Sequence, residues 1–368
     1  MGIWKCSMEG MVMIPEFWQD KKVLVTGHTG FKGSWLSIWL QILGAKVVGY
    51  SLPAPTQPCL FDLAEVGDRM TSIVGDVRDL EHLVQIMKTY KPEIVIHMAA
   101  QALVRESYKH PIETYAVNVM GTVNVLDAIR QVGEVKAFIN VTSDKCYENQ
   151  EWVWGYRESE AMGGYDPYSS SKGCSELVTS AYRNSFFHPA NYEQHGIGIA
   201  TARAGNVIGG GDWASDRLIP DIIKAWQTEQ KFLIRYPHAI RPWQHVLEPL
   251  SGYLTLAEHL YIDGRNYSCA WNFGPNESDA QTVAWIVEQM ANLWDGNVGW
   301  GQEILSQPHE AIYLKLDCSK ARSQLKWRPK LDVKTALSWV IDWSKALQAE
   351  TDMREFTIYQ IRQFMNIN

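Results

Sequence analysis

The sequence predicts an α/β fold in which a doubly wound parallel sheet is followed by a smaller, mostly helical C-terminal domain. Short apolar runs alternate with helix-period segments over roughly the first 200 residues, a glycine-rich turn follows the first apolar run, and the alternation ends after Arg203. Repetition of strand, helix and strand requires right-handed crossovers and hence a parallel sheet of the Rossmann type. Ligands bind beyond the carboxyl ends of the strands in such sheets, so we expect the functional residues there.

The strands are predicted from short runs of apolar and β-branched residues. They cover residues 22–26, 46–50, 73–74, 94–97, 137–141 and 197–203. The segments between them predict helices over residues 31–43, 80–90, 112–132 and 167–187. The first helix has one apolar stripe, formed by Trp35, Leu36, Trp39, Leu40 and Leu43.

The pattern loosens after Arg203, where a glycine-rich segment over residues 205–220 precedes further helix-like stretches. These stretches lie near residues 218–229, 249–262, 280–294 and 335–348. We therefore divide the chain into an N-terminal tail of residues 1–16, a sheet domain of residues 17–204 and a second domain of residues 205–368. Some segments of the second domain are expected to return to the sheet, and both domains are expected to share one cleft.

The composition excludes several classes of protein. A net charge of −7 does not suit a nucleic-acid-binding protein, which needs a basic face. No apolar stretch reaches the length of a membrane span, which is about 18 residues. The six cysteines are scattered without a CxxC pair, and the N-terminus lacks the apolar run of a signal peptide. We therefore expect a cytoplasmic protein without a metal site.

The segment from Thr26 to Gly33 reads TGHTGFKG and lies between a predicted strand and a predicted helix. Its three glycines permit a tight turn and let the backbone approach a pyrophosphate, while the helix N-terminus supplies amide donors. The same glycines also suit a plain turn. We expect a dinucleotide to contact this segment through Gly27, His28, Gly30, Phe31, Lys32 and Gly33.

The second strand lacks the acidic residue that usually holds the ribose hydroxyls of a dinucleotide. It is followed by Ser51, Leu52 and Pro53, so Ser51 and Lys32 are the candidates for this role. On this ground the sequence does not rank NAD against NADP.

Two further strand ends carry residues suited to a cofactor. Asp76 and Val77 follow the third strand, where Asp76 can accept from an adenine amino group, and the neighbouring Asp79 is a candidate helix cap. Ala99 and Ala100 follow the fourth strand and are small enough to let the cofactor lie close to it.

The start of one helix brings together a tyrosine and a lysine. Asp166 is a good N-cap and Pro167 suits the first helical position, so Tyr168 and Lys172 lie one turn apart on one helix face. An ammonium close to a phenol stabilises the phenolate and lowers its pKa. The pair is therefore a candidate base toward a sugar hydroxyl near neutral pH.

The end of the strand over residues 137–141 carries Ser143, Asp144 and Lys145, which offer a hydroxyl, a carboxyl and an amine in sequence. The three residues are candidates for catalysis. They are also compatible with a turn that holds a solvated salt bridge.

Together these residues resemble the extended short-chain dehydrogenase/reductase family, over nearly the whole chain after about residue 16. Ser143, Asp144 and Lys145 stand where the dTDP-glucose 4,6-dehydratases of the family carry Thr-Asp-Glu. Lysine in the third place is similar to the CDP-glucose 4,6-dehydratases. Four longer motifs carry the same similarity, over residues 27–33, 203–213, 216–221 and 241–249.

The resemblance implies NAD as the cofactor and CDP-glucose as the substrate. It implies that Tyr168, helped by Lys172, removes the proton of the glucose 4-hydroxyl as hydride leaves C4, while Ser143 hydrogen-bonds that oxygen. After C5 has lost its hydrogen, Asp144 protonates the departing 6-hydroxyl, and hydride returns to C6. We interpret Lys145 as the base at C5, or else as a group that stabilises the enolate.

The resemblance also implies substrate contacts and an assembly. Asn206, Arg217 and Arg241 are candidates for the pyrophosphate, because arginine pairs bidentately with phosphate oxygens, although each arginine also suits a surface ion pair. Gln101 and Ser143 are further candidate substrate contacts. A homodimer or homotetramer is implied, with contacts through the helices near residues 80–132 and 166–187.

Two other functions remain as alternatives. A sugar-nucleotide 4-epimerase uses Tyr168 and Lys172 in the same way but needs no acid to expel the 6-hydroxyl, so Asp144 discriminates against it. A regulatory nucleotide-binding protein with a dead site is opposed by the intact pair. The residues alone do not select cytidine over another nucleoside. The resemblance implies supply of dideoxyhexoses for surface polysaccharide, as in lipopolysaccharide O-antigen.

Overall fold

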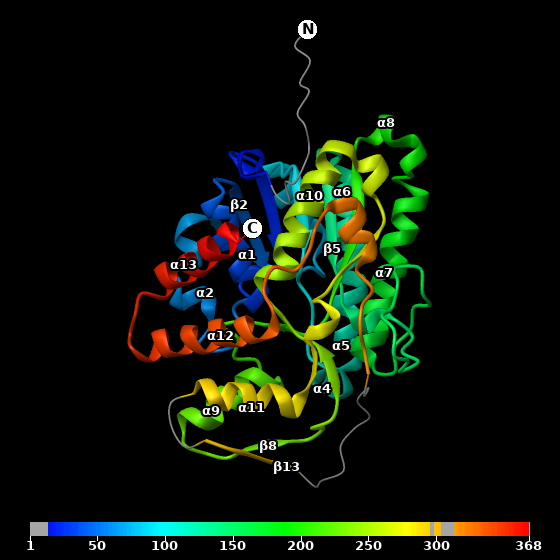
Figure 1. Cartoon of the computed structure of the whole chain (residues 1–368). Coiled ribbons are helices and arrows are strands. Elements are labelled where there is room, and N and C mark those ends of the chain that lie inside the picture. Colours follow the sequence, from blue (N-terminus) through cyan, green and yellow to red (C-terminus); the bar gives the residue numbers. More distant parts are fainter. Residues whose placement is uncertain (1–13, 295–297, 303–312, 368) are drawn as a thin grey trace.

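The computed structural model describes residues 14–294, 298–302 and 313–367, and its centre is one seven-stranded sheet with helices on both faces (Figure 1). The strand order is β11-β6-β5-β4-β1-β2-β3, and every neighbouring pair is parallel. The doubly wound parallel sheet is thereby confirmed. The strands are β1 (Lys22–Thr26), β2 (Lys46–Ser51), β3 (Thr71–Val74), β4 (Ile94–His97), β5 (Ala137–Val141), β6 (Gly198–Ala204) and β11 (Ala270–Phe273).

One face of the sheet is covered by three long helices that pack side by side. They are α3 (Leu80–Tyr90), α6 (Gly121–Val132) and α7 (Pro167–Ser185), and the short helices α4 (Val104–Lys109) and α5 (Pro111–Tyr115) lie against α7. Asp79 caps α3 by accepting from the His82 amide at 3.0 Å, as the sequence predicts. Leu24, Val95 and Phe138 of the sheet belong to the core on this side.

The opposite face is covered by α1 (Phe31–Ile42) and by the long helix α10 (Leu247–Tyr267). Beyond α1 lie α2 (Leu60–Leu63), α12 (Val333–Gln348) and α13 (Met353–Asn366), the last of which ends near the C-terminus (Figure 1). Because α1 has neighbours on its outer side as well, its residues from Gly33 to Leu40 are all buried and not only the predicted stripe. Trp39, for example, meets the Phe364 ring edge-on at 5.6 Å.

Most of the remaining elements form a smaller layer below the carboxyl ends of the strands (Figure 1). Its apolar centre joins α9 (Leu218–Gln227) and α11 (Val283–Leu293) to one side of α12. Short pairs surround it: β8 (Phe232–Ile234) with β13 (Trp300–Gln302), β9 (Ile240–Pro242) with β12 (Ala280–Thr282), and β7 (Val207–Ile208) with β10 (Gln244–His245). The helix α8 (Tyr192–His195) precedes β6.

The two halves of the chain interleave. Helix α10 and strand β11, from the second half of the sequence, lie in the sheet domain, where β11 pairs with β6. Most of the expected tail of residues 1–16 falls outside the described residues. Ile14 is held in place, since its amide donates to the buried Glu258 carboxylate at 3.0 Å.

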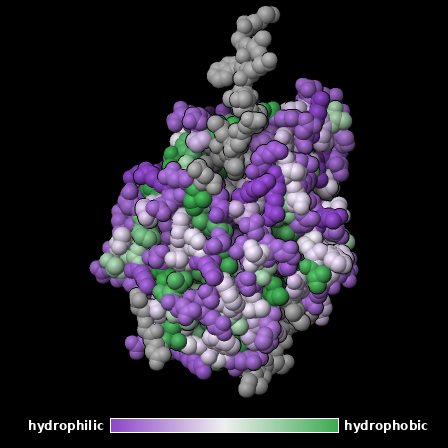
Figure 2. Space-filling view, in the orientation of Figure 1, coloured by the Kyte–Doolittle hydropathy of each residue, from purple (hydrophilic) through white to green (hydrophobic). Residues whose placement is uncertain are grey.

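The surface in Figure 2 is mainly hydrophilic, with hydrophobic residues scattered over it. None of the described helices has the length and hydropathy that crossing a bilayer requires.

Candidate active site

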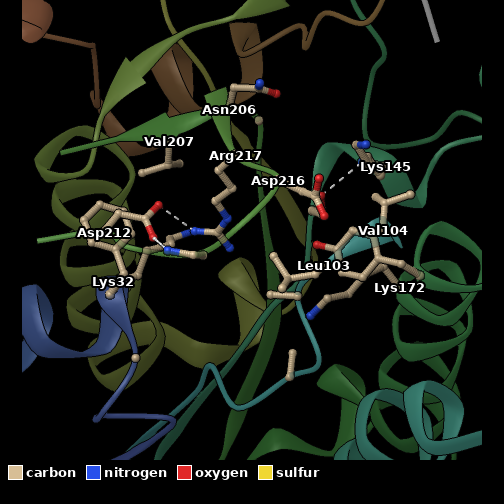
Figure 3. Close-up of a pocket in the computed structure, with 18 of the residues that line it drawn as sticks. Lys32, Leu103, Val104, Lys145, Lys172, Asn206, Val207, Asp212, Asp216 and Arg217 are labelled. Atoms are coloured by element: carbon tan, nitrogen blue, oxygen red, sulfur yellow. Dashed lines mark hydrogen bonds and ion pairs between the residues drawn. The ribbon is translucent and has the colours of Figure 1, made fainter. Parts of the chain in front are cut away.

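The carboxyl ends of the central strands open into one cleft of about 1400 Å³ between the sheet domain and the smaller layer. The turn after β1, the loop after β5, the start of α7 and the segments around α9 all line this cleft (Figure 3). Almost all of the predicted site residues therefore meet in one place, although they span more than 200 residues of sequence. The two exceptions are His28 and Gln101, described below.

The end of the cleft beside β1 and β4 is formed by closely packed backbone segments. Gly27 has φ +78°, and a Cβ there would lie 2.8 Å from the Ala99 amide nitrogen, so the turn after β1 almost touches the end of β4. A Cβ on Gly33 would lie 2.1 Å from the Gly27 carbonyl oxygen. The start of α1 lines the cleft directly after this turn, which is where a dinucleotide pyrophosphate binds in sheets of this type. The cleft is further lined by Gly30, Phe31, Lys32, Ser51, Asp76, Val77, Ala99 and Ala100.

His28 does not face the cleft, contrary to the sequence expectation. Its imidazole Nε2 lies 2.7 Å from the Ser72 hydroxyl, and its ring fills the space over Gly49, where a Cβ would come within 2.3 Å of it. Burial lowers the pKa of His28 to about 4, so the ring is neutral at physiological pH. His28 is a packing residue that joins the glycine-rich turn to β2.

Ser51 and Lys32, the two candidates for contact with the ribose, lie in different parts of the cleft. Ser51 stays at the end of β2, where its hydroxyl lies 2.8 Å from that of Thr29. Lys32 points to the other end of the cleft, and its ammonium lies 3.2 Å from the hydroxyl of Tyr253 on α10. Burial lowers the pKa of Lys32 to about 7, and the charges of Lys172 and Arg217 act in the same direction. Lys32 therefore lies beside Tyr253, near the charges of Lys172, Arg217 and Asp144, and not beside Ser51.

Asp76 lines the cleft but is already engaged. Its carboxylate accepts from the Arg78 guanidinium at 2.9 Å and from the Arg78 amide at 2.8 Å, and Arg78 keeps the pKa of Asp76 low. An adenine amino group that donates to Asp76 would therefore have to share this carboxylate with Arg78.

Tyr168 and Lys172 occupy the first turns of α7, as the N-cap signal predicts. Asp166 accepts from the Ser169 amide at 2.9 Å, and Pro167 takes the first helical position. Contrary to the sequence expectation of a lowered value, burial raises the pKa of Tyr168 to about 12, while hydrogen bonding with Ser143 acts to lower it. Burial lowers the pKa of Lys172 to about 8, and its ammonium donates to the Val141 carbonyl at 3.4 Å.

Ser143 and Asp144 form a buried pair at the end of β5, which excludes the alternative of a solvated turn. The Ser143 hydroxyl donates to Asp144 Oδ1 at 3.0 Å. Asp144 Oδ2 is buried and has no hydrogen-bond partner within the described ranges. Gly205 leaves room for it, since a Cβ there would lie 2.9 Å from that oxygen. Burial raises the pKa of Asp144, so this carboxyl is suited to give up a proton. Lys145 follows, half-buried, and also lines the cleft.

On the side of the smaller layer, Arg217 and Asp212 point toward one another, with 2.8 Å between Nη1 and Oδ2 (Figure 3). Asn206 and the buried Arg241 also line the cleft. Gln101 does not, because its side-chain amide is used within its own loop, donating to the Leu103 carbonyl and to the Thr114 hydroxyl at 3.0 Å each. The sequence expectation that Gln101 contacts substrate is not supported by this placement.

Four residues of the site and of the side chains that contact it were not predicted from the sequence. Asp212 had a signal, since it lies five residues from Arg217 in a motif already singled out. Glu176 also had one, four residues beyond Lys172 on the same helix. Tyr253 had none, because its partner Lys32 is distant in sequence. Arg203 begins the motif over residues 203–213, but nothing in that motif indicates its partner Glu176. Among the described residues, no group of three or more His, Cys, Asp or Glu side chains could hold a metal ion.

Comparison with known proteins gives consistent matches along the chain. The sequence profile of the GDP-mannose 4,6 dehydratase family matches residues 24–339. A CDP-glucose 4,6-dehydratase of Salmonella typhimurium is 58% identical over 95% of this chain and 98% of that protein. A crystal structure of dTDP-glucose 4,6-dehydratase from Bacillus anthracis in complex with NAD has a TM-score of 0.72 at 21% identity, over 90% of this chain and 98% of that one. UDP-glucose 4-epimerase from Thermotoga maritima, solved with UDP-glucose, has a TM-score of 0.75 at 20% identity, over 89% and 99% of the two chains.

Proposed function

Because the chain belongs to the GDP-mannose 4,6-dehydratase family, we propose that it converts CDP-glucose to CDP-4-dehydro-6-deoxyglucose and water with NAD as its cofactor. The similarity to the Salmonella enzyme, over nearly the full length of both chains, supports this substrate. Structural neighbours that bind NAD, together with the close approach of Gly27 to Ala99, support the cofactor.

When bound, NAD supplies an acceptor for hydride from C4 and returns that hydride to C6. Each residue then has one task. Tyr168 takes the proton of the 4-hydroxyl, and Ser143 hydrogen-bonds the same oxygen. Tyr168 must be a phenolate to take this proton, and the positive charge of Lys172 stabilises that form. Once C4 is a ketone, Lys145 takes the acidified hydrogen of C5 as a proton, and Asp144 gives a proton to the 6-hydroxyl, which leaves as water. As hydride returns to C6, the proton held by Lys145 returns to C5, which gives the 4-ketone with a 6-methyl group. Arg217, Arg241 and Asn206 hold the pyrophosphate.

A single observation favours dehydration over epimerisation. Asp144 is a buried carboxyl with a raised pKa, and it is hydrogen-bonded to Ser143 next to Tyr168. An epimerase needs the tyrosine but has no leaving group to protonate. A proton donor beside the oxidising tyrosine is what elimination of water requires.

The proposal is tested by incubating the protein with NAD and, separately, CDP-glucose, dTDP-glucose, UDP-glucose and GDP-mannose. We expect CDP-glucose to lose one water by mass spectrometry, with kcat/KM for the others lower by about 10²-fold or more. Inversion at C4 without loss of water, seen by NMR, would instead establish the epimerase. Loss of water from another nucleotide sugar in preference to CDP-glucose would contradict the substrate assignment.

We also propose that residues 17–204 bind NAD and that residues 205–368 contribute the substrate side, since Asn206, Arg217 and Arg241 come from the latter. A cytoplasmic location is supported by Cys59, Cys146, Cys174, Cys269 and Cys318, which are all free thiols. The product class is consistent with supply of deoxysugars for surface polysaccharide.

We propose that the protein is a homodimer, or a homotetramer built from such dimers, and that α5 and α7 form the dimer contact. Ile112 of α5 is 85% exposed and Leu177 of α7 is 60% exposed. Tyr115, the last residue of α5, and Met120, just before α6, are exposed nearby, and α5 packs against α7. Large apolar side chains gathered on neighbouring helices are typical of a protein interface.

Ile112→Asp is expected to raise the dimer dissociation constant about tenfold or more, because it places a charge at a buried apolar contact. Sedimentation velocity over a concentration series measures this. Ile262→Asp is the matched control, since Ile262 on α10 is 66% exposed and lies outside the proposed interface. A wild-type protein that sediments as a monomer throughout, or equal constants for both variants, would refute this interface.

A further inference from the structure

We propose that the buried ion pair of Glu176 and Arg203 is a positioning element for the reaction, which fixes the loop that carries Ser143 and Asp144 against the helix that carries Tyr168 and Lys172. This inference rests on the proposed function and goes beyond it, since neither residue lines the cleft. The two halves of the active site come from different elements, and their relative position has to be held by something other than the substrate.

Glu176 connects the helix to the loop. It follows Tyr168 and Lys172 at intervals of four residues, so all three share one face of α7. Its carboxylate accepts from the Thr142 hydroxyl at 2.5 Å and from the Thr201 hydroxyl at 2.7 Å. Thr142 directly precedes Ser143, so the first of these bonds joins α7 to the beginning of the catalytic loop.

Arg203 holds the other end of the same loop. Its Nε and Nη2 atoms bind the Glu176 carboxylate side by side, at 2.9 Å and 2.8 Å. Its Nη1 atom donates to the Tyr147 hydroxyl at 2.7 Å, and the Tyr147 hydroxyl donates to Asn272 at 2.7 Å. Tyr147 closes the loop three residues after Asp144. The loop is therefore anchored before Ser143 and after Lys145 by a single bidentate pair.

The burial of this pair makes it rigid. The Glu176 and Arg203 side chains are only 5% and 4% exposed, and every interaction named above is shielded from water. Bidentate arginine–carboxylate pairs have a fixed geometry, and hydrogen bonds between buried groups are costly to break. A displacement of about 1 Å at a catalytic group can cost about 10² in rate. The pair is thus in a position to control kcat without touching substrate.

Two mild variants test this, each cutting one end of the anchor while the ion pair stays intact. Thr142→Val keeps the shape of the side chain but removes its bond to Glu176, and Tyr147→Phe removes the hydroxyl that Arg203 binds. We expect each to lower kcat for CDP-glucose about tenfold, with KM changed less than about twofold. Thr142→Ser restores the hydroxyl and is expected to recover most of the lost kcat.

The matched control is Thr357→Val on α13. The Thr357 hydroxyl is equally buried and accepts from Trp343 Nε1 at 3.1 Å, but it lies outside the cleft. If the variants at 142 and 147 lose no more kcat than Thr357→Val, or if Thr142→Ser is as slow as Thr142→Val, the positioning role is wrong. A wild-type protein inactive toward every nucleotide sugar would refute the proposed function instead, so the two failures are distinguishable.

Discussion

Tyr168→Phe is expected to lower kcat for CDP-glucose by about 10²- to 10⁴-fold, the range over which a positioned acid–base group contributes. In the proposed mechanism oxidation of C4 is the first step, and the later steps depend on it. The Tyr168 hydroxyl, at the buried start of α7, is the proposed acid–base group, and it is hydrogen-bonded with Ser143. The variant removes one oxygen and leaves the ring in place, so we expect the fold to be retained.

The measurement is twofold. Single-turnover absorbance reports formation of the reduced cofactor, and mass spectrometry reports loss of water; both are expected to fall together in Tyr168→Phe. Tyr182→Phe is the control, because Tyr182 lies on the same helix but outside the cleft. A Tyr168→Phe protein that oxidises C4 at the wild-type rate would remove Tyr168 from its proposed role.

The positions of six strands along the chain and the residues at their ends could be predicted because both follow local patterns. Apolar runs predict the strands, and a parallel sheet brings their carboxyl ends together. The sequence therefore predicts that Gly27, Ala99, Ser143 and Tyr168 share one cleft. The direction in which an individual side chain points could not be predicted in this way. His28 turns inward because Gly49 opens a space for its ring, and no pattern around His28 indicates this.

Elements whose position depends on distant contacts could not be predicted from local sequence patterns. Strand β11 has no continuous apolar run, because Asn272 is a buried residue of the strand whose polar side chain bonds Tyr147 and Tyr156. The partners of that side chain are more than 100 residues away, and the strand itself pairs with β6, where Ala270 lies opposite Thr201. Helix α13 does carry a helical period of buried residues, from Met353 to Phe364, so its existence could have been predicted, but its place against α1 could not.

Asp144→Asn is expected to stop the reaction between oxidation and elimination. The amide keeps the shape of the carboxyl but has no proton to give, so loss of water should fall by about 10²- to 10⁴-fold. Tyr168 is unchanged, so C4 should still be oxidised and the reduced cofactor should accumulate. Exchange of the C5 hydrogen with solvent deuterium should also continue, since Lys145 remains.

Lys145→Ala is the companion variant and separates the two steps. If Lys145 is the base at C5, its loss should stop deuterium exchange while C4 oxidation persists. Exchange at the wild-type rate in Lys145→Ala would leave Lys145 as a stabilising charge only. Loss of exchange in Asp144→Asn, with exchange kept in Lys145→Ala, would transfer the role of the base to Asp144.

The pH dependence gives an independent check on Asp144. Burial raises its pKa in the folded protein, so the elimination rate should fall as the pH rises through that value, and the fall should be absent in Asp144→Asn. The folded carboxyl also holds its proton more tightly than the unfolded one. It therefore contributes stability that is present below the ordinary pKa of an aspartate and is lost as the pH rises toward the folded pKa. Chemical denaturation should accordingly find that Asp144→Asn gains stability relative to wild type between mildly acidic and neutral pH. A relative loss over that range would mean that the ionised carboxylate is the form the fold prefers, and Asp144 could not serve as the acid.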